Sequence, residues 1–365
     1  MRRAAASFAA ACCLLCGPAW GWGNQGHELI NRAAARALGE EVPDWLRAAE
    51  ERLAYLGPEP DRWRVRELET LDRGAAPDHY IDLEWARGID PKTPPPTRHE
   101  FARIVARNLR RSPDNVGYAP YRAIELCQRL EAHIASLALV DGDGPAATAR
   151  RRQARENVLF TAGILGHYVA DLSNPHHCSI HFNGWKGPNP KGYPTDAGTH
   201  WRFESAFVER VLDRLEVRVS APVRTDLDYG RAVWDLVVES NGKIEELYAL
   251  DRDGAFAPGG EERPEGRRGV AFVVERMNRA ATLLRDLWST ACARGTLRGR
   301  SEALRLRIKE ALRAAGLDLR VAVRLDGHVR VWGEIHSAEE GRRARAIVAA
   351  CEGVASSEFR LRALY

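Results

Sequence analysis

Hydrophobic residues recur at helical spacing along most of the chain. In residues 269–288 (GVAFVVERMNRAATLLRDLW), apolar side chains return every three or four positions, which is the period of an amphipathic α-helix. From Trp22 to about Cys292, such segments alternate with loops rich in proline and glycine, and no convincing two-residue period of a strand occurs. We therefore expect one mainly α-helical domain over residues 22–292, with the loops as its surface connections.

The pattern changes near residue 300. An amphipathic helical segment, 301–316, is followed by two alternating segments around the tight turn Asp326-Gly327, then by a second helix and a last alternating segment. The predicted later elements are strands 320–325 and 328–335, a helix opened by the capping box Ser337/Glu340, and strand 357–364. This order predicts a small α+β module (αββαβ) over residues 301–365, joined to the helical domain by a linker at residues 293–300.

The first 21 residues have the layout of a secretory signal peptide. Two arginines precede a short apolar run, and small residues at Ala19 and Gly21 favour cleavage after Gly21. The run is too short to span a membrane as a helix of the mature protein. We expect an exported protein, periplasmic or secreted, whose mature chain begins at Trp22.

Composition is that of an ordinary globular protein, with 45% hydrophobic and 28% charged residues among 365. The formal net charge of +4 falls to +2 when Arg2 and Arg3 leave with the signal peptide, which argues against a protein built mainly to bind polyanions. The cysteines beyond the signal peptide could pair in an oxidising compartment, but their wide spacing shows no disulfide framework. They are Cys127, Cys178, Cys292 and Cys351.

The clearest chemical signal is the histidine-rich stretch ILGHYVADLSNPHHCSIH, residues 164–181. His167 and Asp171 are four apart in a helical segment, so their side chains project from one face, one turn apart. Pro175 disfavours continuation of the helix, so His177 approaches from the following turn. This spacing is typical of a set of metal ligands.

A second pair with the same spacing, His200 and Glu204, follows a loop rich in glycine and proline. One such pair alone is more often a surface hydrogen bond, but two pairs with an additional histidine favour metal binding. Nitrogen and carboxylate ligands without clustered thiolates suit zinc better than manganese or iron.

Upstream, the ordered series continues with Trp22 at the predicted mature N-terminus, a histidine five residues on, an aspartate and a histidine. With H-x-x-x-D-x-x-x-x-x-H and H-x-x-x-E, the chain resembles the zinc-dependent phospholipase C / P1-type nuclease superfamily over about residues 22–292. The resemblance implies three zinc ions. It implies Asp61, His79, His167 and Asp171 as ligands of one ion, the α-amino group and carbonyl oxygen of Trp22 with His27 and Asp171 for a second, and His177, His200 and Glu204 for the third.

The resemblance also implies the chemistry of a hydrolase that acts on phosphodiesters. Two ions bridged by Asp171 would share a water and lower its pKa from about 15.7 toward about 7, which gives a metal-bridged hydroxide as the nucleophile. Asp61 is implied as a proton acceptor, so Asp61 and Asp171 are the predicted catalytic residues. Because an internal tryptophan has no free amine, this site would be complete only after cleavage at Gly21. Asp82 is a further candidate, as a residue that orients a ligand.

The substrate is predicted from the last ligand. Lipases of this superfamily have H-x-x-x-E, as at His200 and Glu204, whereas the nucleases usually have H-x-x-x-D, and Phe203 and Phe207 are spaced as in the lipases. We therefore expect a phospholipase C that releases diacylglycerol and a phosphorylated headgroup. The alternatives are a nuclease that prefers single strands, whose aromatic side chains would stack on bases, and a non-catalytic envelope-binding protein stabilised by zinc.

The C-terminal module resembles the BON domain of bacterial envelope proteins over nearly its whole length. The segments that carry the resemblance are the hairpin DGHVRVWGEI and the helix GRRARAIVAACEGV. The resemblance implies residence in the periplasm or outer envelope, with phospholipid or a membrane surface as a partner. A plain interaction module is the alternative, and the sequence indicates no protein partner.

Overall fold

The structure, a computed structural model, describes residues 22–86, 88–109 and 112–364, and it is mainly helical with one small sheet. The prediction of a mainly α chain with a small β component is confirmed, while the predicted signal peptide lies outside the described residues. The α-helices before the sheet are α1 (Gly23–Arg36), α2 (Asp44–Arg47), α3 (Glu50–Leu56), α4 (Glu69–Ala75), α5 (Arg98–Leu109), α6 (Ala119–Leu137), α7 (Pro145–Ser173), α8 (Thr199–Trp201), α9 (Val208–Val211), α10 (Tyr229–Asn241), α11 (Ile244–Arg252) and α12 (Pro264–Ala314).

Short 3₁₀ segments and one π-helical segment connect these α-helices in the described residues. The 3₁₀ segments are Glu59–Trp63, Ala76–His79, Leu83–Trp85, Pro113–Asn115, Pro175–Cys178 and Leu212–Arg214, and the π-helix is Arg202–Phe207. Several of them carry proline within their first two positions, where its missing N–H costs nothing. The predicted metal ligands lie mostly on these short elements or next to them.

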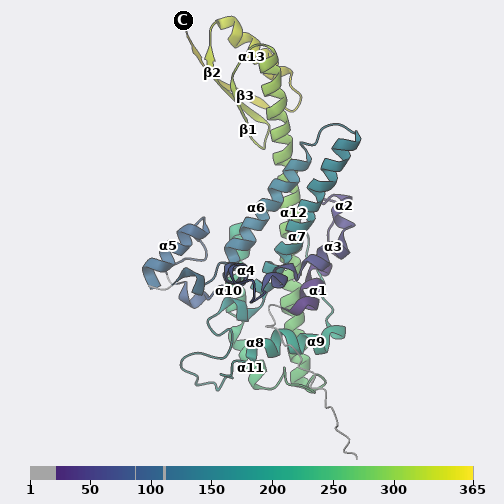
Figure 1. Cartoon of the computed structure of the whole chain (residues 1–365), viewed down its shortest axis with the longest axis vertical. Coiled ribbons are helices and arrows are strands. Elements are labelled where there is room, and N and C mark those ends of the chain that lie inside the picture. Colours follow the sequence, from purple (N-terminus) through teal and green to yellow (C-terminus); the bar gives the residue numbers. More distant parts are fainter. Residues whose placement is uncertain (1–21, 87, 110–111, 365) are drawn as a thin grey trace, which may run out of the picture.

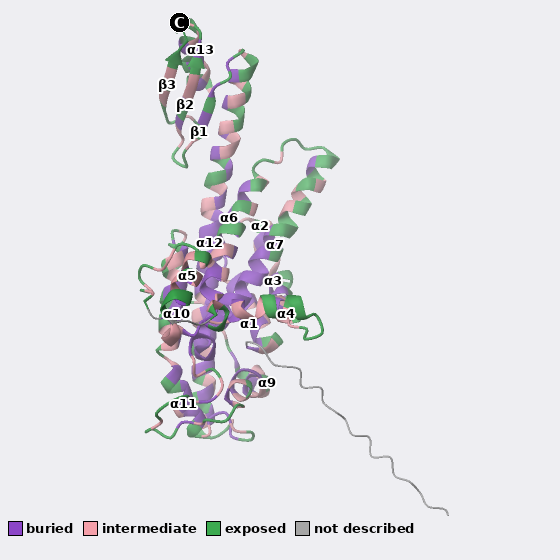
Figure 2. Cartoon of the chain, turned by 60° about the vertical axis from the view of Figure 1, so that its left-hand side comes forward, coloured by how far each residue is buried: buried purple, intermediate pink, exposed green. Residues whose placement is uncertain are grey.

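The helical body is built around the long helices α6, α7 and α12, which pack against one another, with α1 and α3 against α7 (Figure 1). Buried residues gather where these helices meet in the lower part of the molecule (Figure 2). Trp288 of α12 is fully buried there, and its Nε1 donates a hydrogen bond to the carbonyl oxygen of Ala162 in α7, 3.1 Å away. The centre of the body is therefore fixed by long helices rather than by loops.

The predicted linker at residues 293–300 is helical and belongs to α12, which runs without a break for 51 residues. Gly295 and Gly299, which the sequence suggested as part of a boundary, face α6 at close range. An added Cβ would lie 2.7 Å from the carbonyl oxygen of Glu131 at Gly295, and 2.7 Å from that of Ala135 at Gly299. The glycines therefore serve close helix packing, and the predicted helix at 301–316 is the C-terminal part of α12.

The C-terminal module has the predicted order of helix, two strands, helix and strand. It comprises the end of α12, β1 (Arg320–Val323), β2 (His328–Ile335), α13 (Ala338–Ala350) and β3 (Ser356–Ala363). In the sheet, β2 is central, antiparallel to β1 and parallel to β3. Ser337 caps α13 as predicted, because its Oγ accepts a hydrogen bond from the N–H of Glu340 at 3.1 Å.

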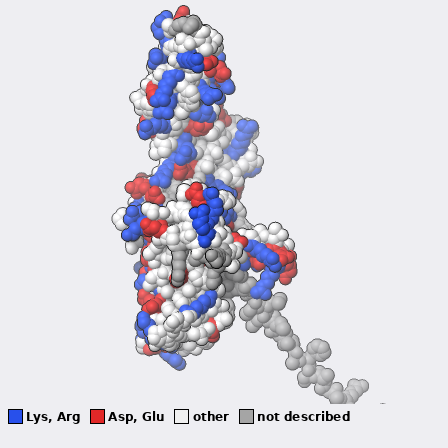
Figure 3. All heavy atoms as spheres, turned by 90° about the vertical axis from the view of Figure 1, so that its left-hand side faces the viewer, with Lys and Arg blue, Asp and Glu red and all other residues white. Residues whose placement is uncertain are grey.

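The module has its own hydrophobic core, separate from that of the body. Leu304, Ile308 and Leu312 of α12 pack there against Val329 and Val331 of β2. The module therefore sits at the far end of α12, away from the body (Figure 1). On the face seen in Figure 3, basic and acidic side chains are mixed over the whole length. Within the described part of the chain, no helix has the length and apolar character needed to cross a membrane.

The contact between α12 and α6 gives a test of the fold. Replacing Gly299 by leucine should destabilise the protein by about 1–3 kcal/mol, because a larger side chain must push the two helices apart. The free energy of unfolding, measured by urea denaturation followed by circular dichroism, checks this. The Arg300→Leu variant, at the exposed neighbouring position, should stay within about 0.5 kcal/mol of the wild type; equal stability of both variants would contradict the close packing.

Candidate metal centre

The predicted ligands converge at the centre of the helical body, although they come from six separate segments. Within the described residues, three groups of His, Asp and Glu side chains could each hold a metal ion, with ligand atoms within 4.8 Å of one another. The first group is Asp61, His79 and His167, the second is His27, His167 and Asp171, and the third is His177, His200 and Glu204. Every predicted histidine, aspartate and glutamate ligand belongs to one of these groups.

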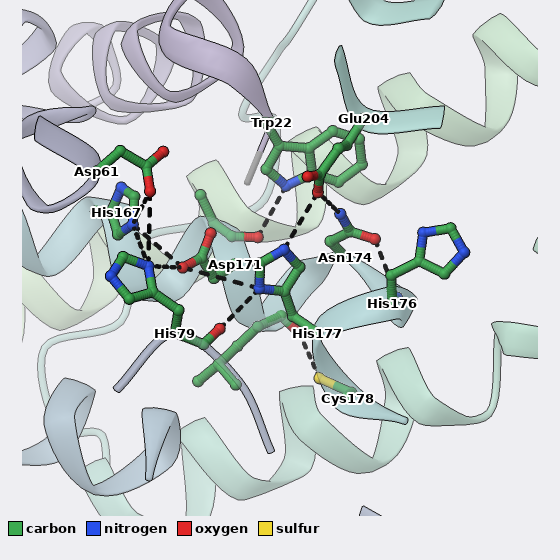
Figure 4. A network of polar contacts seen from close by, with 12 residues as sticks. Trp22, Asp61, His79, His167, Asp171, Asn174, His176, His177, Cys178 and Glu204 are labelled. Atoms are coloured by element: carbon green, nitrogen blue, oxygen red, sulfur yellow. Dashed lines mark hydrogen bonds and ion pairs between the residues drawn. The ribbon is translucent and has the colours of Figure 1, made fainter. Parts of the chain in front are cut away.

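The first group lies between the 3₁₀ segments and α7. Asp61 Oδ1 is 3.7 Å from His79 Nδ1 and 3.6 Å from His167 Nε2, and the two histidine nitrogens are 3.0 Å apart. Asp171 Oδ2 completes the cluster at 3.1 Å from His79 Nδ1 and 3.2 Å from His167 Nε2 (Figure 4). The four residues predicted to hold one ion therefore surround one point.

The second group adds His27 of α1 to the other side of Asp171. His27 Nε2 is 3.5 Å from Asp171 Oδ1 and 3.9 Å from Asp61 Oδ2. The His27 ring stacks on the His167 ring with centroids 4.1 Å apart. Asp171 thus presents one carboxylate oxygen to each of two neighbouring groups, which is the arrangement of a bridging ligand.

Close packing of α1 against α7 brings His27 to this place. Asn31, one turn after His27, donates hydrogen bonds to the carbonyl oxygens of Leu53 (2.8 Å) and Gly163 (3.0 Å), and so ties together α1, α3 and α7. Gly166, directly before His167, has no room for a side chain, because an added Cβ would lie 1.8 Å from Asn31 Oδ1. The buried asparagine and the glycine therefore set the distance between the two histidines.

The third group is formed where α8 passes into the π-helix. Glu204 Oε2 is 3.2 Å from His177 Nε2 and 2.7 Å from His200 Nε2, and the two histidine nitrogens are 3.2 Å apart. His200 is the most accessible of the three, with 19% of its side chain exposed. A π-helical turn is uncommon and often marks a functional site. This group is the one that solvent and a ligand reach most easily.

Backbone carbonyl groups fix the orientation of two of these histidines. His167 Nδ1 is 3.0 Å from the carbonyl oxygen of Gly57, and His177 Nδ1 is 2.7 Å from that of His79. A carbonyl oxygen only accepts, so each Nδ1 carries a hydrogen, and each Nε2 faces the carboxylates as the nitrogen that a cation would use. This is how proteins usually orient histidines that bind a metal.

Several buried atoms of the site have no hydrogen-bond partner among the described residues. They are both ring nitrogens of His27, Asp61 Oδ1, His79 Nε2, Asp171 Oδ1 and Glu204 Oε1. Unpaired buried polar atoms are costly in ordinary protein interiors. With lone pairs and carboxylate oxygens converging on the same points, the residues fit bound cations.

The electrostatics of the centre agree with this fit. Burial raises the pKa of Asp61 to about 8, and the charges of Asp171 and Glu204 act in the same direction against an opposing effect of His167. Burial also raises the pKa of Asp171, but His167 and His177 outweigh it and hold the pKa well below its ordinary value. The histidines therefore keep Asp171 charged, while Asp61 retains a proton that a cation would displace.

The pKa values of the buried histidines shift in opposite directions. Burial lowers the pKa of His27 well below its usual value and that of His79 to about 4. For His177, Asp171 and Glu204 overcome the effect of burial and raise the pKa to about 10. His27 and His79 are thus neutral at physiological pH, as metal-binding imidazoles must be.

Trp22 lies in the same centre. Its side chain is fully buried, and its Nε1 donates hydrogen bonds to the carbonyl oxygen of Ala170 at 2.8 Å and to Ser173 Oγ at 3.2 Å (Figure 4). Its ring packs on Phe203, with centroids 5.4 Å apart. The residue is thus anchored beside Asp171 and Glu204, while the role of its α-amino group stays a prediction, since it depends on cleavage at residue 21.

Two positioning residues were not predicted. Asn174 Nδ2 donates to Glu204 Oε2 at 2.9 Å, and Asn174 Oδ1 accepts from the N–H of His176. Glu84 accepts from Ser179 Oγ at 2.7 Å and from the N–H of Ile180 at 2.9 Å, and so holds the segment that follows His177. The asparagine before Pro175, within the ligand stretch, was a signal that could have been used, but nothing local marked Glu84.

The residues considered beside the ligands have other surroundings. Asp82 is buried, which raises its pKa to about 7, but none of the hydrogen bonds found among the described residues joins its carboxylate to a ligand. His176 packs against His200 and Phe203, and His181 stacks on Trp185 with centroids 3.9 Å apart. The four cysteines among the described residues are free thiols, and Cys178 Sγ donates to the carbonyl oxygen of Leu172.

A comparison with models of protein families finds no match, and a search of curated proteins finds no significant match either.

The contact between Asn174 and Glu204 predicts a measurable effect on metal binding. In Asn174→Ala, Glu204 loses the donor that orients it, so zinc affinity at the third group should fall by roughly 10–100-fold. Competition with a chromophoric chelator measures this loss. Asn115→Ala, at an exposed position outside the centre, should bind zinc as the wild type does; an unchanged affinity in Asn174→Ala would contradict the positioning role.

Proposed function

We propose that the protein is an exported zinc-dependent phosphodiesterase, most closely a phospholipase C of the zinc-dependent phospholipase C / P1-type nuclease superfamily. One observation carries the proposal: the groups share ligands, since His167 belongs to two of them and Asp171 presents an oxygen to each side. Structural zinc sites are closed sets of four ligands for one ion. Shared carboxylates between neighbouring ions are typical of enzymes that hydrolyse phosphate esters. The nitrogen and carboxylate donors suit zinc.

Zinc held at these groups would polarise a phosphoryl oxygen and would lower the pKa of water to about 7. The side chains of this chain have distinct tasks around that chemistry. Asp171, fully buried and kept ionised by His167 and His177, holds the cluster together. Asp61 has 10% of its side chain exposed, and its carboxylate, once a cation has displaced the proton that it carries in the metal-free protein, is placed to accept a proton from the solvent side.

Substrate would reach the centre from the side of the third group. His200 is partly exposed, and its neighbour Trp201 is 51% exposed. Phe182, which follows the ligand stretch, is 39% exposed. Solvent-exposed apolar side chains beside a buried polar centre suit a substrate that has one charged and one apolar part, as a phospholipid has.

Exposed apolar side chains also occur between two of the ligands. Val65, Leu68 and Leu71, on the segment that connects Asp61 to His79, are all exposed. These exposed side chains favour a lipid substrate. Glu204 at the last ligand position favours it as well, because the lipases that the sequence resembles have a glutamate there. The proposed products are diacylglycerol and a phosphorylated headgroup.

A single-strand nuclease is the second candidate. The exposed ring of Trp201, next to a ligand of the third group, favours it, because base stacking on aromatic side chains is the usual way to hold single strands. Phospholipid remains the first choice because of Glu204 and the exposed aliphatic side chains near Asp61.

The proposal predicts lipid cleavage that depends on the third group. Zinc-loaded protein beginning at Trp22 should release diacylglycerol from phosphatidylcholine and phosphatidylethanolamine vesicles. Glu204→Ala should reduce the rate at least roughly a hundredfold, because it removes the carboxylate that His177 and His200 share. Chromatographic quantification of diacylglycerol measures the rate.

Glu209→Ala, an exposed acid on the next helix, is the matched control and should be fully active. Full activity of Glu204→Ala would refute the assignment of the site. Cleavage of single-stranded DNA without any lipid cleavage would establish the nuclease candidate instead.

A further inference from the structure

A group of arginines lies on α7 far from the metal centre. Arg150, Arg151, Arg152 and Arg155 fall within six residues at the start of this helix, and the first acidic residue after them is Glu156. Helical spacing places Arg151, Arg152 and Arg155 on one side of α7. The basic charge is therefore local, although the predicted mature chain is close to neutral.

These arginines differ in how they are held. Arg151 donates hydrogen bonds through Nη2 to the carbonyl oxygens of Gly142 at 2.6 Å and Val140 at 3.3 Å, which anchors it to the turn before α7. Arg152 and Arg155 have no acidic partner within ion-pair distance in the described part of the chain. The guanidinium of Arg155 lies over the Trp45 ring, 5.2 Å from its centroid. Two positive charges are thus available to an external anion.

The arginines surround a hollow of about 470 Å³ between α7 and α2. Trp45 of α2 forms one wall, and the residues of α7 that line the hollow are Thr148, Arg151, Arg152, Arg155, Glu156 and Leu159. The volume is in the range of small-ligand sites, roughly 300–1,000 Å³. The hollow therefore combines an aromatic wall, a hydroxyl group, three guanidinium groups and one carboxylate, so that basic groups stay in excess in a space suited to one small anionic group.

We propose that this hollow is a binding site for a phosphate ester. Guanidinium groups present pairs of N–H donors that match two phosphate oxygens, so arginines recognise phosphate better than a point charge does. The phosphate ester can come from the headgroup of an anionic phospholipid or from a free phosphorylated headgroup.

The site is separate from the metal centre and does not depend on the proposed catalysis. Arg152 and His167 are fifteen residues apart on α7, which corresponds to about 22 Å along the helix axis. The phosphate bound in the hollow is therefore not the one that would react. At a membrane it would belong to a neighbouring lipid, and it would hold the protein on the surface.

The surroundings favour a phosphate ester over a nucleic-acid strand. Sequence-independent binding of single strands uses aromatic rings with a free face for base stacking. The only aromatic ring of the hollow, that of Trp45, is partly buried and covered by the guanidinium of Arg155. The test must therefore distinguish binding of a phosphate ester from binding of single-stranded nucleic acid.

The test compares two phosphate sources on full-length protein beginning at Trp22 that carries Glu204→Ala, so that no probe lipid is consumed. One arm measures sedimentation with vesicles of phosphatidylcholine, with and without phosphatidylglycerol, and the other titrates glycerol phosphate by calorimetry. The test variant adds Arg152→Gln and Arg155→Gln. The control adds Arg103→Gln and Arg107→Gln, which removes the same charge from exposed positions of α5.

We expect the test variant to bind at least about tenfold more weakly than the control, as the loss of two arginines near an anionic surface implies. Weakening in the phosphatidylglycerol arm alone identifies the lipid headgroup as the source, and weakening with glycerol phosphate identifies the free ester. Equal binding by both variants in both arms overturns the proposal. So does binding of single-stranded DNA when neither phosphate probe binds.

Because Arg155 packs on Trp45, its loss could disturb the local structure. The single variant Arg152→Glu, at an exposed position without a partner in the described chain, leaves that contact intact. It should show the same loss with an unchanged thermal midpoint, and wild-type binding by this variant would also overturn the proposal.

Discussion

The carboxylate of Asp171 is the group on which the rest of the structure depends. It is fully buried, and nitrogens of four histidines lie within 4.0 Å of its oxygens: His27, His79, His167 and His177. A buried carboxylate without such neighbours is too costly to keep ionised. The body of the protein is built to bring these rings to one point, and the third group extends the same cluster through His177 to Glu204. Carboxylate oxygens and ring nitrogens without a hydrogen-bond partner among the described residues converge in this cluster, so the cluster could hold metal ions.

The packing of the long helices follows from this requirement. Asn31 and Gly166 hold α1 close to α7, which fixes His27 against His167, and the buried indole of Trp22 fastens the start of the described chain beside the last turn of α7. In the third group, Asn174 orients Glu204 by a hydrogen bond, and Glu84 holds the segment that follows His177. The candidate metal centre and the proposed phosphate-ester site share one element, since α7 carries His167 and Asp171 at its C-terminal end and Arg152 and Arg155 near its N-terminal end. One long helix therefore connects the proposed reacting centre with the hollow proposed to bind phosphate esters.

Sequence reasoning worked where the signal is local. The spacing of His167 and Asp171, and of His200 and Glu204, is a property of one helical turn, so both pairs could be predicted without knowing the fold. The strands and caps of the C-terminal module are equally local, as the capping contact of Ser337 shows. The predicted linker at residues 293–300, which contains Gly295 and Gly299, is helical in the structure, because a sequence does not show whether a glycine ends a helix or allows close packing of a neighbour. Glu84 was not predicted because its hydrogen-bond partners, Ser179 and Ile180, are 95 and 96 residues away along the chain.

The central claim is that one cluster of shared ligands holds several zinc ions. Anomalous diffraction at the zinc edge from crystals of zinc-loaded protein beginning at Trp22 tests it most directly. The account predicts three peaks: one among Asp61, His79, His167 and Asp171, one beside His27 and Asp171, and one among His177, His200 and Glu204. A single peak enclosed by four protein ligands, or no peak within this cluster, would contradict it.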